Sequence, residues 1–369
     1  MVVLTKTGKG AMDNLVAEIS RNKRIPGFLF GATSATEEIY LKPSGYNIVN
    51  DPASGLINED STFALCGQGK IITHLAALQL VERGLVTLET PISDYIPEFA
   101  DLVVLDDQLA DVFTFKPAKT IMRLKHVLNF TSGMFYPLKG FSLAQQPEAY
   151  IAPYTKDDPI SQFLSFIKGD LPGIPLLFEP GENYVHGWSS DIAGFLVEKI
   201  TGQTLEEYLQ ENIFKPLNMK ASFYLTPDIK DRLVDMTFRR NDILEAWAAG
   251  AATNPILTSK TVEQLFEPVL NEQGSKSLDR FLTMDPFTPA THTQWSVGGF
   301  ALSGSDLPGR RKKGSGFWIG WAHTLFLIDP ASGIATVFGA QIMPAGDREI
   351  FEVVAELEEA LYAGLSSEA

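Results

Sequence analysis

The chain has 369 residues, 45% of them hydrophobic and 20% charged, which is enough for one large or two interleaved globular units with a full core. Its net charge of −15 excludes nucleic acids and anionic membranes as expected partners, because both require concentrated Lys and Arg. A single cysteine allows no internal disulfide, and no apolar run reaches the ~18 to 20 residues of a membrane helix. Since residues 1–6 do not resemble a secretory signal, a cytoplasmic protein is expected.

The N-terminal part of the chain predicts a helix followed by two strands. Residues 11–24 place apolar side chains at helical spacing among polar neighbours. A Pro-Gly turn at 26–27 follows, and residues 28–32 and 38–41 are typical of short strands. The fold is therefore expected to begin with a helix that leads into a hairpin.

A lysine marks the start of the next predicted helix. Residues 65–84 indicate a tight turn with flanking glycines, followed by an apolar helix that ends at Gly84. Lys70 lies in the first turn and points inward if Ile71 and Leu75 face the core. A buried ammonium must be paired or have a lowered pKa, and either state serves proton transfer. The alternative is a lysine whose amine reaches the solvent.

The C-terminal half predicts strands and a closing helix. A short helix is expected at 246–249, before the strands begin. Three strands are expected within 295–302 and 325–338, with a turn at 329–333. Residues 347–364 predict an amphipathic helix. No repeat, low-complexity tract or linker divides the chain, so residues 1–369 are expected to form one unit.

The segment around Lys70 resembles the nucleophile helix of the serine β-lactamase and penicillin-binding-protein superfamily, especially its class C-like esterases and fungal lovastatin-type acyltransferases. In that family the helix opens Ser-x-x-Lys, with the serine as nucleophile and the lysine as its proton acceptor. Counting back three residues from Lys70 gives Gly67, so the family's nucleophile is absent. The segments 85–99, 123–133 and 182–219 also resemble parts of the family.

The resemblance implies an α/β fold of the β-lactamase and transpeptidase type. A central antiparallel sheet would be flanked by helices, with a mostly helical domain inserted. Residues 1–66 and 270–369 would form the sheet subdomain, and residues 67–269 the helical subdomain.

A second family motif falls at the start of the segment 182–219. Relatives carry Tyr-x-Asn there, followed by a glycine and a helix. In this register His186 takes the place of the tyrosine, and Ser189 takes that of the asparagine if two residues separate the pair. A shifted register would bring Tyr184 into the cleft, but it would break the match at Gly187.

The third family motif, Lys/His/Trp-x-Gly on a strand beside the nucleophile, falls on Trp318 and Gly320. The resemblance implies that the glycine lets the substrate lie against the strand and that backbone N–H groups there form half of an oxyanion hole. Trp321 and His323 follow closely, and together with Trp188 these side chains are expected to line an apolar ligand pocket. Ordinary sheet packing is the alternative for them.

The first functional hypothesis is an enzyme of fungal-type specialised metabolism that acts on a bulky, mostly apolar small molecule. It would have exchanged acyl transfer for acid–base chemistry, as an isomerase, cyclase or lyase, with Lys70 and His186 as the proton-transferring pair in either order. Ester and β-lactam turnover is not expected, because Gly67 offers no nucleophile. The alternatives are an acyltransferase or esterase with a replacement nucleophile, such as Cys66 or Ser189, and a catalytically silent binding protein.

The other reactive side chains give weaker signals. Cys66 lies one residue before Gly67, which turns its side chain by roughly 100° away from the lysine on a helix, so a buried structural cysteine is the default. His74 lies one turn after Lys70 and either tunes the amine or is polar surface. The histidines have no metal-ligand spacing and no glycine-rich phosphate loop follows a strand, so neither a metal nor another cofactor is expected.

Overall fold

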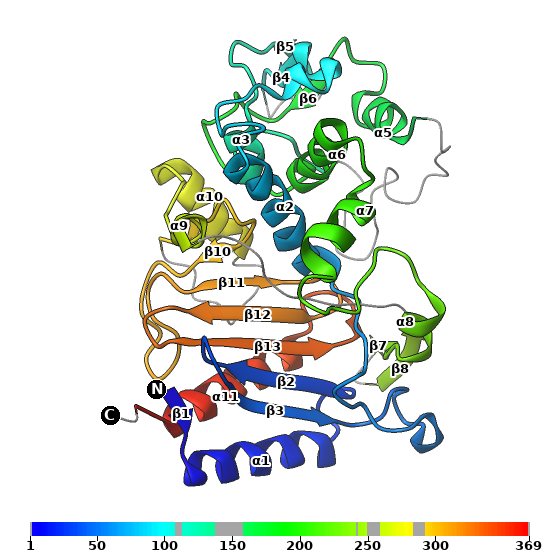
Figure 1. The fold of residues 1–369 in the computed structure, drawn as a ribbon, viewed down its shortest axis with the longest axis vertical. Coiled ribbons are helices and arrows are strands. Elements are labelled where there is room, and N and C mark those ends of the chain that lie inside the picture. Colours follow the sequence, from blue (N-terminus) through cyan, green and yellow to red (C-terminus); the bar gives the residue numbers. More distant parts are fainter. Residues whose placement is uncertain are drawn as a thin grey trace.

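The computed structural model describes residues 2–107, 113–136, 158–240, 243–248, 259–282 and 292–367. Figure 1 shows a central sheet with a mostly helical part at one end, drawn above it, and the helices α1 (Lys6–Arg21) and α11 (Arg348–Gly364) at the other. The strands β1 (Val2–Leu4) and β15 (Leu365–Ser367) pair antiparallel and hold the two ends of the described chain together.

The central sheet has seven strands in the order β3-β2-β13-β12-β11-β10-β9, and every neighbouring pair is antiparallel. Their bounds are β2 (Phe28–Thr33), β3 (Glu38–Ser44), β9 (Gln294–Trp295), β10 (Ala301–Leu302), β11 (Gly316–Ile319), β12 (Thr324–Asp329) and β13 (Ile334–Ala340). The N-terminal hairpin predicted from the sequence therefore pairs with a strand from the far end of the chain.

One hydrophobic core lies between this sheet and the two flanking helices. Helix α1 buries Met12, Val16 and Ile19, whose spacing of three and four residues places them on one face. They pack in one cluster with the sheet residues and with buried positions of α11. The antiparallel sheet flanked by helices that the resemblance implies is confirmed.

The remaining elements form the helical part and two small sheets. The helices and helical turns are η1 (Pro52–Ser54), η2 (Cys66–Gly69), α2 (Lys70–Glu82), η3 (Ile92–Asp94), η4 (Pro97–Ala100), α3 (Leu124–Leu128), α5 (Pro159–Lys168), α6 (Ser189–Thr201), α7 (Leu205–Leu209), η5 (Gln210–Phe214), α8 (Pro227–Asp231), α9 (Ser259–Gln264) and α10 (Glu272–Leu282). The strands are β4 (Leu102–Leu105), β5 (Phe115–Pro117), β6 (Ile174–Leu176), β7 (Asp235–Arg240), β8 (Ile243–Ala248) and β14 (Ile342–Met343).

Helix α2 is buried on all sides. All nine residues from 72 to 80 are buried, and the helix packs against α6 within the larger hydrophobic core. A helix enclosed in this way has few ways to shift, so its first turn is held where the helical part meets the sheet (Figure 1). That turn carries Lys70.

The prediction of a short helix at 246–249 is wrong for residues 246–248, which the structure describes. Residues 243–248 form strand β8, which pairs antiparallel with β7. A short apolar run has no decisive periodicity, and the neighbouring strand satisfies its backbone hydrogen bonds.

Two arginines share one buried carboxylate beneath the sheet. Arg310 donates to Glu358 at 2.7 Å, and Arg311 donates to it at 3.0 Å. Glu358 and Arg311 are 4% and 6% exposed. The carboxylate therefore compensates guanidinium charge in a site with little water.

Replacing Glu358 by glutamine is expected to lower the free energy of unfolding by about 3 to 5 kcal/mol, because it removes the carboxylate that forms buried ion pairs with Arg310 and Arg311. Urea unfolding measures the change. The matched control is Glu272→Gln, which removes an exposed pair with Lys276 and should leave the urea midpoint close to that of wild type. Equal urea midpoints for the two variants would contradict the assignment.

Candidate active site

A cavity of about 1430 Å³ lies where the start of α2, the loop before α6, α10 and the β11–β12 turn meet. Eight of the ten predicted site residues line it: Gly67, Lys70, Tyr184, His186, Trp318, Gly320, Trp321 and His323. The other two lie in the adjacent core. Trp188 packs edge-on against Tyr136 and Phe163, and the Ser189 hydroxyl is hydrogen-bonded to that of Ser132 at 2.8 Å.

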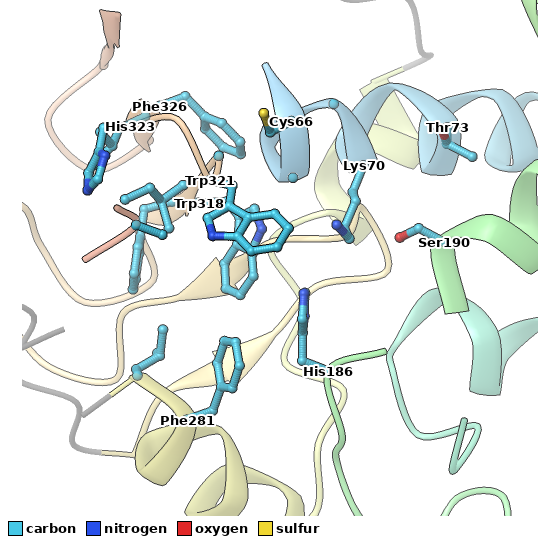
Figure 2. Close-up of a pocket in the computed structure, with 18 of the residues that line it drawn as sticks. Cys66, Lys70, Thr73, His186, Ser190, Phe281, Trp318, Trp321, His323 and Phe326 are labelled. Carbon is cyan, nitrogen blue, oxygen red and sulfur yellow. The ribbon is translucent and has the colours of Figure 1, made fainter. Parts of the chain in front are cut away.

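The Lys70 amine faces the interior of this cavity. Figure 2 shows the amine, the His186 ring and the Ser190 hydroxyl pointing into the same space. Among the residues that the structure describes, the amine has no hydrogen-bond partner. Burial lowers the pKa of Lys70, and the negative charge of Asp191 opposes this to a smaller extent. A larger share of the amine is therefore neutral than in an exposed lysine, and a neutral amine can accept a proton.

Gly67 leaves an open slot directly in front of this amine. A Cβ at position 67 would lie 3.4 Å from Lys70 Nζ, 3.4 Å from the carbonyl oxygen of Ile319 and 3.9 Å from Trp318 Nε1. These are ordinary contact distances, so an added Cβ fits without a clash. The site keeps the space of the nucleophile that the family motif carries, and the space is open to the cavity.

His186 is held within a stack of aromatic rings. Its ring stacks on Phe130 at 5.3 Å and on Phe281 at 4.9 Å between centroids. Its Nδ1 is buried and has no hydrogen-bond partner among the described residues. Burial, assisted by the charge of Lys70, lowers the pKa of His186 well below its usual value. The ring is therefore neutral near pH 7. It can relay a proton, but it is not a protonated general acid at this pH.

Tyr184 also lines the cavity, and its hydroxyl is buried without a partner among the described residues. Burial raises the pKa of Tyr184 well above its usual value, so the phenol stays protonated. It can donate a hydrogen bond, but it cannot serve as a base near neutral pH.

The glycine of the strand motif is required by a close approach of the backbone. A Cβ at Gly320 would lie 2.0 Å from the carbonyl oxygen of Leu65 and 2.5 Å from Thr324 Oγ1. The missing side chain therefore makes room for the chain just before η2. This is a different reason from the substrate contact that the resemblance implies. The Gly320 N–H donates to the carbonyl of Thr324 at 2.7 Å.

His323 serves the fold from the edge of the cavity. It is fully buried, its Nδ1 donates to the carbonyl of Ile342 at 3.0 Å, and its Nε2 accepts from the N–H groups of Gly346 and Asp347. Both ring nitrogens are therefore occupied. This bonding fixes the turn that leads into α11.

Cys66 does not share the space in front of Lys70. Its sulfur accepts hydrogen bonds from the backbone N–H groups of Trp321 and Ala322, and Figure 2 shows it pointing away from the Lys70 amine. These bonds and the lysine charge lower the pKa of the thiol, but burial has the larger effect and raises it. Neighbouring atoms desolvate the sulfur, but the residue as a whole is exposed, so the prediction of a buried structural cysteine is wrong. Its backbone has a positive φ of 47°. The N–H groups of Trp321 and Ala322 lie in the β11–β12 turn and are bonded to the sulfur.

Comparison with known proteins defines the family. Residues 12–359 match the family model described as Beta-lactamase. The chain belongs to the β-lactamase family. The chain is 25% identical to the monacolin J acid methylbutanoyltransferase of Aspergillus terreus, over 95% of both chains.

Two further relatives agree with this placement. The chain is 32% identical to the lovastatin esterase of Penicillium rubens, over 58% of this chain and 53% of the esterase. Its fold matches an unliganded simvastatin synthase of Aspergillus terreus with a TM-score of 0.80 and 24% identity, over 97% of this chain and 99% of the other.

These relatives correct the predicted chemistry. An isomerase, cyclase or lyase was expected because Gly67 stands where the family motif has its serine. That prediction is wrong, because the β-lactamase-family relatives are named as acyltransferases and esterases. They point to acyl transfer or hydrolysis instead.

The sequence did not predict the aromatic neighbours of this β-lactamase-family site. Phe130, Phe281 and Trp295 surround His186 and Trp318, with Trp295 edge-on to Trp318 at 4.7 Å. They come from distant parts of the chain, so no local pattern connects them. The share of aromatic residues, 11%, is the one signal that the sequence offers.

His74 is a buried anchor, and the polar-surface alternative for it is wrong. It is fully buried, its Nδ1 is hydrogen-bonded to the carbonyl of Val297 at 3.0 Å, and its Nε2 is hydrogen-bonded to the Ser190 hydroxyl at 2.8 Å. The neutral tautomer with N–H on Nδ1 satisfies both bonds. Burial lowers the pKa of His74 to about 4.

Wild-type stability is expected to fall as the pH drops from 6.5 towards 4. Over this range the unfolded state binds a proton at His74 and the folded state does not, which costs about 1.4 kcal/mol per pH unit. Melting temperatures between pH 4 and 7 measure the slope, and His74→Gln should reduce it by the share of His74. His126, His186 and His323, whose pKa values are also lowered by burial, keep the remainder. His292→Asn, at an exposed histidine, is the control and should keep the wild-type slope. A slope unchanged in His74→Gln would contradict the prediction.

Proposed function

We propose that the protein catalyses acyl transfer or ester cleavage without a covalent acyl-enzyme. The substrate would be an ester or thioester of a bulky, mostly apolar small molecule in fungal-type specialised metabolism. The relatives named for monacolin J acid and lovastatin support this class of substrate. The cytoplasmic location expected from the sequence belongs to the same proposal.

One observation carries the proposal: the slot at Gly67 lies 3.4 Å from Lys70 Nζ. A serine hydroxyl would occupy this slot in the Ser-x-x-Lys arrangement. Without it, the hydroxyl of an acceptor alcohol or of water can take the same position beside the amine. The neutral share of Lys70, which its burial increases, makes the amine an acceptor for that proton.

The reaction then needs one tetrahedral intermediate. The acceptor hydroxyl gives its proton to Lys70 Nζ while its oxygen forms a bond to the acyl carbon. The bond from the acyl carbon to the alkoxide or thiolate leaving group breaks next, and Lys70 returns the proton to that group. The Trp318 indole N–H borders the slot and can donate a hydrogen bond to the developing oxyanion.

Cys66 is the competing nucleophile, and its position argues against it. Its sulfur points away from the Lys70 amine, and burial raises the pKa of the thiol. Covalent transfer through the sulfur would therefore lack both a base and a thiolate.

The test uses p-nitrophenyl and thioester substrates with an added alcohol acceptor. We expect turnover above a heat-denatured control, sequential two-substrate kinetics and no acyl adduct in the intact mass. Cys66→Ala should retain the activity. A burst of product with an acyl adduct on Cys66, lost in Cys66→Ala, would favour the thiol. No turnover of any ester or thioester would overturn the proposed function.

A further inference from the structure

A second reactive arrangement follows from the same slot. We infer that Lys70 is itself a nucleophile and binds aldehydes or ketones with an aromatic body by forming an imine at Nζ. This goes beyond acyl transfer, because the new bond is made to the lysine and no acyl group moves.

The geometry fits a carbonyl group. A carbon atom at the Cβ position of residue 67 would lie 3.4 Å from Lys70 Nζ. Reacting atoms approach to about 3 to 3.5 Å before a bond forms, so this distance suits a reaction. Trp318 Nε1 lies 3.9 Å from the same point. With a C=O bond of about 1.2 Å aimed at the indole, the oxygen would lie about 2.7 Å from that nitrogen.

Both protein groups are available for this carbonyl. In the described part of the chain, neither Lys70 Nζ nor Trp318 Nε1 has a hydrogen-bond partner. The indole N–H can only donate, so it suits a carbonyl oxygen that gains negative charge. In its neutral form the amine is a nucleophile that can attack a carbonyl carbon, and lysines in apolar pockets acquire this reactivity.

The charges around the amine keep this form accessible. The titratable groups near it are Cys66 on η2, His74 on α2, His186 before α6 and Asp191 on α6. Both histidines are held neutral by burial, and the Cys66 thiol is protonated near pH 7. Asp191 is the one of these groups that favours the ammonium near pH 7, and burial of the amine outweighs it.

The wall beside the slot selects the body of the ligand. Phe281 stacks on Trp318 at 6.3 Å between ring centroids, with an angle of 12° between the planes. His186 packs beside both rings, with its centroid 4.9 Å from that of Phe281 and 5.6 Å from that of Trp318. A planar aromatic aldehyde can lie along these rings with its carbonyl in the slot.

The chemical step balances without an oxidant or reductant. The Nζ lone pair forms the bond to the carbonyl carbon, and a proton moves from nitrogen to oxygen to give a carbinolamine. The C–O bond then breaks as the C=N bond forms, and the hydroxyl leaves as water with the second Nζ proton, which gives the imine. The neutral His186 ring faces the same cavity (Figure 2) and can relay the proton from nitrogen to oxygen.

The test treats the full-length protein with 2-naphthaldehyde and sodium cyanoborohydride at pH 7, where the hydride reduces the imine to a stable amine. We expect one adduct in the intact mass, mapped by peptide sequencing to Lys70 and formed at least tenfold faster than at any other lysine. Lys70→Arg should lose it. Trp318→Phe, which keeps a ring but removes the N–H, should slow it several-fold.

Lys199→Arg is the matched control, because this exposed lysine lies on α6 and should not affect the adduct. Labelling spread over surface lysines with no excess at Lys70 in the wild type would overturn the inference, and this result does not depend on how any variant folds. Ester turnover measured on the same samples reports separately on acyl transfer. The failure of one proposal is therefore distinguishable from the failure of the other.

Discussion

Replacing Lys70 by methionine is expected to lower kcat/KM for an ester substrate by about 10²- to 10⁴-fold, the usual contribution of a general base. Methionine retains a long apolar stem in the buried first turn of α2 but has no group that accepts a proton. Lys70→Arg should be almost as inactive, because a guanidinium stays protonated in proteins.

Initial rates with a p-nitrophenyl ester at pH 7 to 8 measure this loss. The control is Lys199→Met, which removes an exposed lysine on α6 and should keep the wild-type rate. A Lys70→Met variant that folds, as judged by its circular dichroism spectrum, and retains more than a tenth of the wild-type kcat/KM would show that the amine is not the base.

Replacing Gly67 by serine is expected to create a covalent acyl-enzyme that wild type does not form. The slot accepts a Cβ at 3.4 Å from Lys70 Nζ, so the new hydroxyl can form a hydrogen bond with the amine and be activated by it. Release of the acyl group should be slow, because a neutral His186 stands where the family motif has its tyrosine. We therefore expect the intermediate to accumulate and turnover to stay low.

A fluorophosphonate probe and intact mass spectrometry test this prediction. Gly67→Ser should take up one probe molecule at residue 67, whereas wild type should take up none there. Gly67→Ala is the matched control, because it fills the slot with a methyl group and adds no hydroxyl. A folded Gly67→Ser variant that stays unlabelled would mean that Lys70 does not activate a group in the slot.

The site explains how a family of acyltransferases can include a chain without the motif's serine. Three components are present in this chain: the buried amine, the space beside it and the aromatic wall. What has changed is the identity of the group that occupies the space. In the proposed reaction this group comes from the acceptor, so binding energy for the acceptor must do the positioning that a covalent bond would otherwise do.

Much of the fold was predictable because buried positions in helices and strands produce local patterns of apolar residues in the sequence. Helix α11 was expected from a period of 3.6 residues, since the side chains that face the core recur at that interval, and the strands β2 and β3 were expected from two short runs that follow a Pro-Gly turn. Strand β8 was missed because its short run has no such period. Its state is decided by the backbone of β7 beside it.

The identity of the central site residues was also readable from the sequence. The spacing of Gly67 and Lys70 predicted a lysine at the start of a buried helix with no nucleophile three residues before it. The chemistry was misjudged because the absence of one side chain was taken to end acyl transfer. Spacing within a motif does not show whether the emptied volume can hold a substrate group.

Only the tertiary structure decided how distant segments share space. Gly320 is needed because the backbone of Leu65 lies where its side chain would be, and Cys66 is turned towards the N–H groups of Trp321 and Ala322. His74 is neutral because burial in a closed core lowers its pKa, and Val297 and Ser190 bond its two nitrogens there. Such contacts join residues that are more than 100 positions apart, and they depend on ångström-scale packing of the whole chain, which no local periodicity encodes.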